Sequence, residues 1–590
     1  MSLQFIFGNS GSGKSHYLYQ QIVEESIRHP EKNYLVLVPE QFTMQTQKDL
    51  CMTHPRGGIM NIDVLSFGRL AHRVFEETGK ERQPILDDEG KNLVLRKIAG
   101  NYEDELTVLK GNLKKQGYIS EVKSVISEFT QYGIDFEQLD SFMEGLNPES
   151  YLYYKLKDIR KVYEGFEDYL RDKYITKEEL LDVLSQNVPE AKMLKDSVIA
   201  MDGFTGFTPV QNRLIGELLK VCDKIMLTVE IDRREDPFVY KHPYQLFALS
   251  KQMVTSLTEV AQEVRVEIDE PVWLCKNPSY RFKENPEMAF LEEELFRYSR
   301  RKYSGEKMRS ISLHEVHTPQ EEAQYVAEEI RRLVREGYRY REIAVIASDL
   351  STYADALEKA CDRYEIPVFM DHKKSILLNS FVEYLRSLLV MVEQNYTYES
   401  VFRYLRTSLC GFTRDEVDRL ENYCLALDLK GFKKWDQVWV RKTPMTTKEE
   451  LEELNHLRMH FVEKLTPLHT VLKKRKKTVK EITLAVYEYL VQEKIQEQLA
   501  ELEQKFQEDG ELALAKEYAQ IYRIVLELFD KFVELLGEEE IPLKEYCELL
   551  DAGLEEAKVG VIPPSLDQVV IGDMERTRIK NIRALFFVGA

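Results

Sequence analysis

Short apolar runs and long amphipathic stretches alternate along the 590-residue chain. In the first part of the chain, strand-type runs lie at 4–7, 34–38, 62–67, 197–201 and 224–229. Strands that alternate with helices predict a parallel sheet with both faces covered. The long stretch between the third and fourth runs is helical in pattern and rich in Tyr, Lys and Glu. A helical block of this length between two strands indicates an inserted domain.

A second α/β pattern begins near residue 309. Its strand-like runs are ISLHEV from Ile311, then 343–347 and 366–370, and after a long helical region 569–571 and 584–589. One helix between them has a clear apolar stripe at helical spacing, formed by Ala323, Val326, Ala327, Ile330, Leu333 and Val334. Gly337 follows as a helix stop.

The predicted fold class is therefore α/β, with two nucleotide-fold units on parallel sheets, each interrupted by a helical insertion. The predicted domains are 1–80 with 196–300, a helical insertion at 81–195, a second unit at 301–395 with 556–590, and a second insertion at 396–555. The chain stops at Ala590 directly after a buried-type strand. We therefore expect it to be the front part of a longer protein.

The chain opens with a phosphate-loop motif between a strand and a helix. GNSGSGKS fits G-x-x-x-x-G-K-[ST] at every fixed position, with the residues Gly8, Asn9, Ser10, Gly11, Ser12, Gly13, Lys14 and Ser15. Glycines let backbone N–H groups surround a polyphosphate, Lys14 reaches the β and γ phosphates, and the Ser15 hydroxyl ligates Mg²⁺. The motif predicts ATP and Mg²⁺ as cofactors. A P-loop kinase or other phosphotransferase would need only this motif, but it leaves the second α/β pattern unexplained.

The composition is that of a soluble globular protein, with 43% hydrophobic and 31% charged residues. The sequence shows no signal peptide and no apolar run long enough to span a bilayer. Its seven cysteines lack metal-like spacing. These features favour a cytoplasmic protein with no membrane partner.

The formal charge of −20 confines any nucleic-acid contact to local basic surfaces. The candidates are the basic stretches at 296–303, 331–342 and 473–480, whose ordinary interpretation is a solvated face.

Four further motifs carry a family resemblance. VLSFGRLAHRVFEE (64–77), VIAMDGFTGFTPVQ (198–211) with Asp202 and Gln211, and the closing segment 568–590 occur in the order of the motifs of superfamily I (UvrD/RecB-like) DNA helicases. More narrowly, VPEQFT, VLSFGRLAHRVF, DGFTGFTPVQ and GVIPPSLDQVVIGDMERTR resemble the AddB family (RexB in some lineages), the B subunits of bacterial AddAB helicase-nucleases. The resemblance covers essentially the whole chain.

The resemblance implies a heterodimer with AddA that acts on duplex DNA ends in repair and recombination. It implies two RecA-like domains, with Asp202 and Gln211 at the nucleotide and Ser15 and Asp202 holding Mg²⁺. It also implies a track in which the 3′-ended single strand is scanned for Chi. The DNA-binding residues carried over by position are Gln41, Thr43, Phe67, Arg69, His72 and Phe207. Family members are about twice as long, so we expect the nuclease domain and the 4Fe-4S cluster only in the full-length protein.

Hydrolysis needs more than a nucleotide pocket. In motor helicases a second carboxylate activates water, but Gly203 stands at that position. Ser348 stands where the second domain would supply an arginine, and the Gly-Asp-x-x-Gln motif is absent. We therefore expect ATP binding without efficient hydrolysis and assign no catalytic residue. An active ATP-driven helicase is the alternative, and a purely structural subunit with a vestigial loop is another.

Overall fold

The computed structural model describes all residues except 80–83, 113–115, 172, 306–307, 371–373, 444–445, 560–566, 575–576, 578 and 580. The chain forms two compact units. Unit 1 comprises residues 1–86, 124–366 and 573–590, and unit 2 comprises 87–123 and 367–572. The four domain ranges given above stay a prediction. Much of the GVIPPSLDQVVIGDMERTR motif lies outside the described residues.

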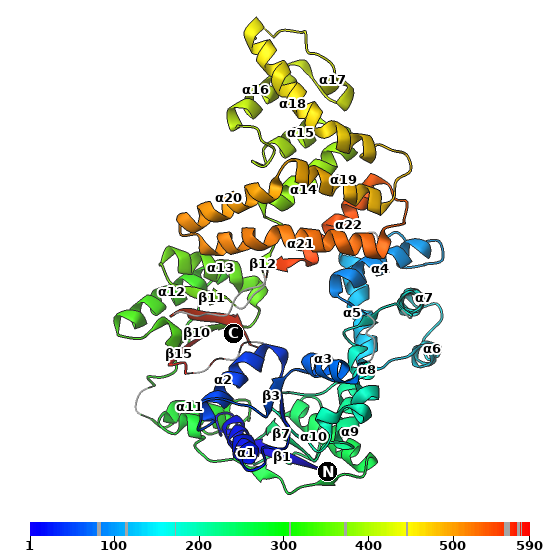
Figure 1. Ribbon diagram of the computed structural model, residues 1–590. Coiled ribbons are helices and arrows are strands. Elements are labelled where there is room, and N and C mark those ends of the chain that lie inside the picture. The colour runs from blue at the N-terminus through cyan, green and yellow to red at the C-terminus, as the bar shows by residue number, and fades with distance from the viewer. Residues whose placement is uncertain are drawn as a thin grey trace. The chain divides into compact units, whose positions relative to one another are not determined.

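A parallel sheet forms the centre of unit 1 (Figure 1). Its strands are β1 (Ser2–Gly8), β2 (Tyr34–Leu37), β3 (Ile62–Leu65), β6 (Val198–Met201), β7 (Lys224–Glu230), β8 (Glu267–Ile268) and β9 (Val272–Trp273). The strand order is β3-β2-β6-β7-β1-β8, with β9 also paired to β1, and each of these pairings is parallel. The predicted parallel sheet is confirmed, and the five predicted strands differ from the apolar runs only at their ends, whereas the short strands β8 and β9 were not predicted.

Alternating side chains give this sheet two apolar faces. On one face, Ile6 and Val36 pack with α1 (Lys14–Arg28) and α2 (Thr43–Thr53). On the other, Phe5 and Leu37 pack with a second set of helices. These are α3 (Phe67–Thr78), α8 (Leu180–Asn187), α9 (Pro209–Leu219) and α10 (Ala248–Glu263). Such a sheet is buried on both sides, which explains its nearly continuous apolar strands.

The remaining elements of unit 1 are mostly helical. They are η1 (Glu40–Phe42), β4 (Ile85–Leu86), α5 (Gln116–Tyr132, which begins in unit 2), α6 (Phe136–Glu144), α7 (Tyr151–Leu170), β5 (Ile175–Thr176), η2 (Val188–Glu190), η3 (Lys192–Leu194), η4 (Tyr280–Phe282), α11 (Pro286–Glu294), α12 (Pro319–Arg335), η5 (Tyr340–Glu342), β10 (Ile343–Ala347), α13 (Leu350–Arg363) and β15 (Ala584–Val588). β4 pairs with β5, and β10 pairs with β15, both in parallel.

Helix α12 follows the sequence prediction closely. Thr318 caps its N-terminus through the Glu321 N–H, and Pro319 occupies the first turn. Ala323 and Ile330 belong to its buried stripe, and Gly337 follows with φ +98°. The strand predicted at ISLHEV is wrong, because residues 311–316 form no β-pairing. Its side chains are largely exposed, and Leu313 is 93% exposed, unlike the buried residues of the sheet strands.

Unit 2 is dominated by helices. They are α4 (Asp88–Asn101), α14 (Ser380–Glu393), α15 (Tyr398–Leu405), α16 (Arg414–Leu427), α17 (Phe432–Asp436), α18 (Lys448–Leu472), α19 (Val479–Gln492), α20 (Ile495–Glu508), α21 (Leu512–Leu536) and α22 (Leu543–Glu556). Two short strand pairs accompany them, β11 (Val368–Met370) with β14 (Val569–Asp573) and β12 (Lys374–Ser375) with β13 (Lys558–Val559). Helix α4 packs against α21 and α22, where Arg96 forms a 2.8 Å ion pair with Glu548.

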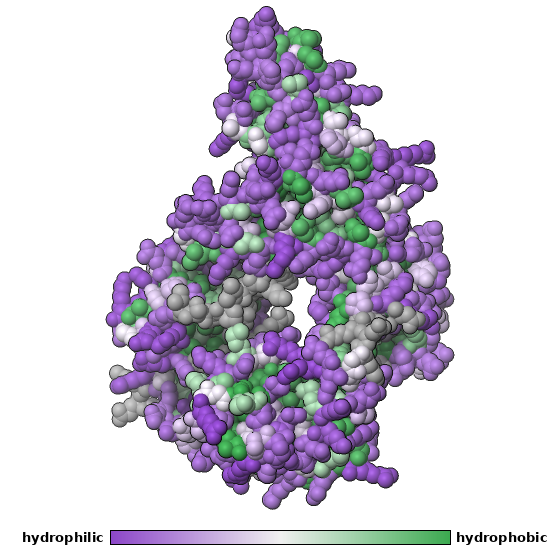
Figure 2. Space-filling model, viewed as in Figure 1, coloured by the Kyte–Doolittle hydropathy of each residue, from purple (hydrophilic) through white to green (hydrophobic). Residues whose placement is uncertain are grey.

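Within the described part of the chain, no helix combines the length and apolar character needed to cross a bilayer. Figure 2 shows hydrophilic residues over most of the visible face, with apolar residues in small separate patches.

Candidate nucleotide-binding site

The turn between β1 and α1 depends on glycine. β1 ends at Gly8, and α1 begins at Lys14. Gly11 (φ +71°) and Gly13 (φ +93°) have left-handed backbones, which residues with a Cβ rarely adopt. A Cβ at Gly8 would lie 2.4 Å from Ser12 Oγ. The motif therefore has the strand, turn and helix context that a phosphate loop requires.

Polar atoms of this loop are buried without a hydrogen-bond partner in the structure. They include Asn9 Oδ1 and Ser12 Oγ, together with Ser279 Oγ from a segment that contacts the loop. The space beside Gly13 is open, since a Cβ placed there would meet no atom within 4 Å. Buried polar groups normally have partners. The Ser12 and Ser279 hydroxyls and the backbone N–H groups of the loop could donate to phosphate oxygens, whereas Asn9 Oδ1 only accepts and could not. These donors fit a polyphosphate.

Lys14 points back over its own loop. Its Nζ donates to the carbonyl oxygens of Gly8 and Asn9, each at 2.9 Å. Burial lowers the pKa of Lys14, while the negative charges of Glu230 and Asp202 act in the opposite direction. A partly buried ammonium with two exchangeable carbonyl partners is suited to bind a terminal phosphate.

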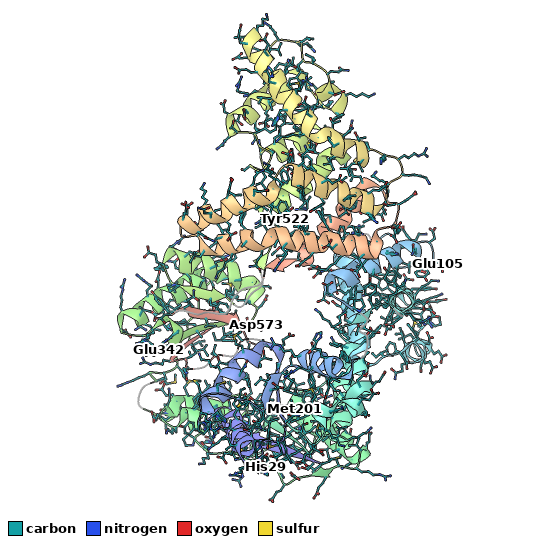
Figure 3. The ribbon with its side chains drawn as sticks, in the orientation of Figure 1. His29, Glu105, Met201, Glu342, Tyr522 and Asp573 are labelled. Carbon is teal, nitrogen blue, oxygen red and sulfur yellow. The ribbon has the colours of Figure 1, made fainter. Side chains whose placement is uncertain are left out.

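Asp202 lies directly after β6, one residue beyond Met201, which Figure 3 labels. Its side chain is almost fully buried and accepts three hydroxyl hydrogen bonds. Ser15 Oγ donates to Oδ1 at 2.9 Å, Thr228 Oγ1 to Oδ1 at 2.7 Å, and Tyr19 OH to Oδ2 at 2.7 Å. The structure thus brings together the two residues predicted to hold Mg²⁺, Ser15 and Asp202.

No group of three or more His, Cys, Asp or Glu side chains with metal-site geometry occurs among the described residues. Proteins commonly hold Mg²⁺ by another arrangement, with one or two protein oxygens completed by phosphate oxygens and water. The Ser15 hydroxyl and the Asp202 carboxylate fit that arrangement.

Two other predicted positions have structural tasks. Gly203 has φ +79° and carries no side chain that could activate water. Gln211 forms a capping box at the start of α9, where its Oε1 accepts the Thr208 N–H at 2.9 Å. Its predicted contact with nucleotide stays a prediction.

A carboxylate that sequence reasoning missed stands opposite the start of the loop. Glu230 is the last residue of β7, and the β1–β7 register places it beside Gly8. It is exposed, and its charge acts on Lys14. The sequence could have indicated this carboxylate, since Glu230 directly follows a predicted strand. Parallel strands end at the same edge of a sheet, so Glu230 could be expected near the loop that follows β1.

An arginine that sequence reasoning also missed touches the loop. The Arg281 N–H donates to the Gly11 carbonyl at 3.1 Å, and the Arg281 side chain packs beside Gly11. Its positive charge contributes to lowering the Lys14 pKa, although burial is the larger cause. Local pattern could not reveal this contact, because Arg281 lies far along the chain in a short 3-10 helix. Ser348, the position expected to have lost an arginine, follows β10.

The candidate DNA-binding residues follow three adjacent strands. Gln41 and Thr43 come after β2, Phe67 and Arg69 after β3, and Phe207 after β6. Because β3, β2 and β6 are neighbours in a parallel sheet, these segments share its carboxyl edge. The structure therefore brings these predicted segments to one side of the sheet.

The environments of these side chains differ. Gln41, Arg69 and His72 are exposed, whereas Thr43 is buried and its hydroxyl donates to the Glu40 carbonyl at 3.0 Å. Ser66 caps α3 by accepting the Arg69 N–H, which fixes the turn that presents Arg69.

Phe67 is 8% exposed and belongs to the core beneath α3. Its ring centroid lies 5.5 Å from that of Phe204 and 6.3 Å from that of Phe207. Phe204 and Phe207 are partly buried on top of this core. The rings that remain accessible for base stacking are therefore those of Phe204 and Phe207, and sequence reasoning missed the first.

The basic stretches differ in how their charges are used. In 296–303, Arg297 pairs with Asp232 and Glu235, each at 2.8 Å. In 331–342, Arg332 pairs with Glu329 and Glu336. In the third stretch the side chains at 473–476 are exposed. Arg297 and Arg332 therefore form ion pairs with acidic side chains of the protein itself.

A phosphate-loop motif lies between β1 and α1 of the parallel sheet, and its serine is bonded to a buried aspartate, which is the arrangement found in P-loop folds. Comparison with family models gives two matches. The model described as ADDB, N-terminal, matches residues 5–292, and the model described as UvrD-like helicase C-terminal domain matches residues 282–585.

The comparison with individual proteins agrees. A protein of Lachnoclostridium phytofermentans, named as the B subunit of an ATP-dependent helicase/deoxyribonuclease, is 42% identical over 596 residues, covering 100% of this chain and 52% of the relative. Proteins of the same name from Clostridium novyi and Acetivibrio thermocellus are each 33% identical, with 51% and 52% of their lengths covered. The chain belongs to the AddB family, and it spans about half the length of the curated relatives it matches.

Proposed function

We propose that this chain is the helicase-like part of the B subunit of an ATP-dependent DNA helicase-nuclease, and that it binds ATP with Mg²⁺ but turns it over little or not at all. The observation that carries the proposal is the contact between Ser15 and the buried Asp202 beside Lys14. Ser15 and Asp202 would hold Mg²⁺, which would neutralise phosphate charge when bound. The proposed architecture is that of two RecA-like domains with helical insertions, to which the parallel sheet and the UvrD-like match lend support.

Loss of turnover rests on Gly203. Hydrolysis requires a group that orients and activates water, and glycine offers none. Arg281 and Glu230 favour the second candidate, an active helicase, since they supply an arginine and a carboxylate close to the loop. Neither Arg281 nor Glu230 places a carboxylate at position 203, directly after Asp202.

The proposed DNA contact is the carboxyl edge of β3, β2 and β6. Arg69 and Gln41 can hydrogen-bond phosphates or base edges, and Phe207 can stack on an unpaired base. His72 shares the exposed side of α3 with Arg69. Thr43, being buried, would act through the turn that presents Gln41.

The wider assignment follows the family. The relatives are named as subunits of a helicase/deoxyribonuclease. We extend this to a cytoplasmic heterodimer with AddA that processes duplex DNA ends, passes the 3′-ended strand and recognises Chi. Nuclease chemistry and a 4Fe-4S cluster would belong to the part of such relatives that this chain does not span.

The test is to measure nucleotide binding and steady-state ATPase activity, with and without single-stranded DNA, for the chain and for Lys14→Ala. We expect Lys14→Ala to weaken ATP binding at least tenfold, because the variant loses the cation that faces the terminal phosphates. Lys48→Ala, an exposed position on α2, is the matched control and should bind normally. DNA-stimulated turnover that Lys14→Ala abolishes would show an active motor instead.

A further inference from the structure

A glutamate from a distant helix holds the first variable residue of the phosphate loop. Both carboxylate oxygens of Glu292, on α11, accept from Asn9 Nδ2 at 3.1 Å. The two residues are 283 positions apart in the chain. Glu292 is partly buried, and burial raises its pKa.

The surrounding contacts fix α11 in this position. Ahead of the helix, the Arg281 N–H is bonded to the Gly11 carbonyl. At the start of the helix, Glu287 accepts the N–H groups of Arg309 and Ser310, at 2.9 and 2.6 Å. Glu292 is therefore held against the loop from both sides and is not a freely moving surface side chain.

The end of the helix is tied down by ion pairs. Arg301 pairs with Glu293 at 3.0 Å and with Glu294 at 2.6 Å. Arg234, two residues after Asp232, lies 3.9 Å from Glu294. Every acidic neighbour of Glu292 on the last turn of α11 thus has a cationic partner, whereas Glu292 itself is bonded to a neutral amide.

The contact with Asn9 lies at the residue whose carbonyl also accepts from Lys14 Nζ. The lysine of a phosphate loop reaches the β and γ phosphates. Here Lys14 Nζ is bonded to the carbonyls of Gly8 and Asn9, so these residues surround the place where Lys14 would meet a terminal phosphate. Glu292 and Glu230 both bring negative charge to this end of the loop, and the charge of Glu230 also acts on Glu292.

A triphosphate places one more negative group at this end than a diphosphate does. We propose that Glu292 discriminates against the γ-phosphate by charge repulsion, so that the site prefers ADP to ATP, and that ATP binds only when the Glu292–Asn9 contact opens. This inference rests on the proposed nucleotide binding. It deepens that proposal by naming the residue that selects between the two nucleotides and the contact that ATP must displace.

The experiment measures affinities for Mg²⁺-ADP and for the slowly hydrolysed analogue Mg²⁺-ATPγS by calorimetry, with no turnover needed. Glu292→Gln keeps an amide oxygen for Asn9 but removes the charge. We expect it to raise the affinity for ATPγS about tenfold relative to ADP, which corresponds to about 1.4 kcal/mol. Glu284→Gln, an exposed position that pairs at the surface with Lys283, is the matched control and should leave the ratio unchanged.

A Glu292→Ala variant controls for any effect of the amide introduced by Glu292→Gln. It should also raise the affinity for ATPγS relative to ADP. A ratio that is the same in the unaltered chain, Glu292→Gln and Glu292→Ala, with both nucleotides bound, overturns the inference and leaves the proposed nucleotide binding intact. If neither nucleotide binds the unaltered chain, the proposed function fails as well. Thermal unfolding of each variant separates a loss of fold from a loss of selectivity.

Discussion

At the scale of single residues, the centre of the site is one buried carboxylate with three hydroxyl donors. Ser15 and Tyr19 lie on the first turns of α1, and Thr228 lies on β7. Hydrogen bonds to a charged group are roughly twice as strong as neutral ones. The three hydroxyls therefore offset much of the free energy that burying the Asp202 carboxylate costs.

Removing one of these donors should destabilise the fold. We expect Tyr19→Phe to lower the free energy of unfolding by about 1–3 kcal/mol, because the buried carboxylate loses a partner. Urea unfolding followed by circular dichroism measures the change. Tyr17→Phe is the control on the same helix, since no hydrogen bond of its hydroxyl is found among the described residues. Equal losses in the two variants would mean that the hydrogen bond from Tyr19 to Asp202 adds nothing to the free energy of unfolding.

At the scale of elements, close helix packing in unit 2 depends on a glycine. A Cβ at Gly553 of α22 would lie 2.6 Å from Leu528 Cδ1 of α21. Leu528 is itself buried, so it has little room to move. The two helices approach closely because position 553 has no side chain.

A pair of glycine substitutions tests this packing. Gly553→Ala should destabilise unit 2 by about 1–3 kcal/mol through overpacking. Gly100→Ala, at an open position near the end of α4, should be neutral or stabilising by up to about 1 kcal/mol. Thermal melting of both variants measures the effects, and a Gly553→Ala variant as stable as Gly100→Ala would contradict the packing argument.

Local elements were largely predictable from the sequence, whereas contacts between distant segments were not. The alternating strands, the phosphate loop and the stripe of α12 depend on neighbouring residues, so pattern sufficed. The pairing of Ser15 with Asp202 was implied by the family resemblance. The positions of Arg281 and Glu292 could not be predicted, because they depend on how η4 and α11 lie against the loop. ISLHEV has strand composition but no strand partner, and composition cannot reveal that.

At the scale of the whole molecule, the formal charge of −20 opposes binding to DNA except where exposed cations are concentrated. Arg69 is exposed on α3, and no ion pair of its side chain is found among the described residues. Arg73, one turn along, is already paired with Asp63 at 2.6 Å. The two arginines of one helix therefore differ in their availability to a phosphate.

We expect Arg69→Ala to weaken binding to single-stranded DNA and to reduce the slope of log affinity against log salt by about 0.7, the value for one phosphate contact. Fluorescence anisotropy of a labelled oligonucleotide at several salt concentrations measures both quantities. Arg28→Ala, at the exposed end of α1, removes the same charge elsewhere in unit 1. An equal loss of affinity in the two variants would indicate a general charge effect and not a contact at Arg69.

The threading of the chain also affects how it is made. Unit 1 takes its last stretch from residues 573–590, after the whole of unit 2. Strand β10 pairs with β15, so Ile343 is synthesised well before its pairing partner Ala584 exists. At a synthesis rate of about 5–20 residues per second, that wait is roughly 10–50 s. During this time the nascent chain has an apolar strand, buried in the finished protein, without this neighbour, and such an unpaired edge is prone to aggregation.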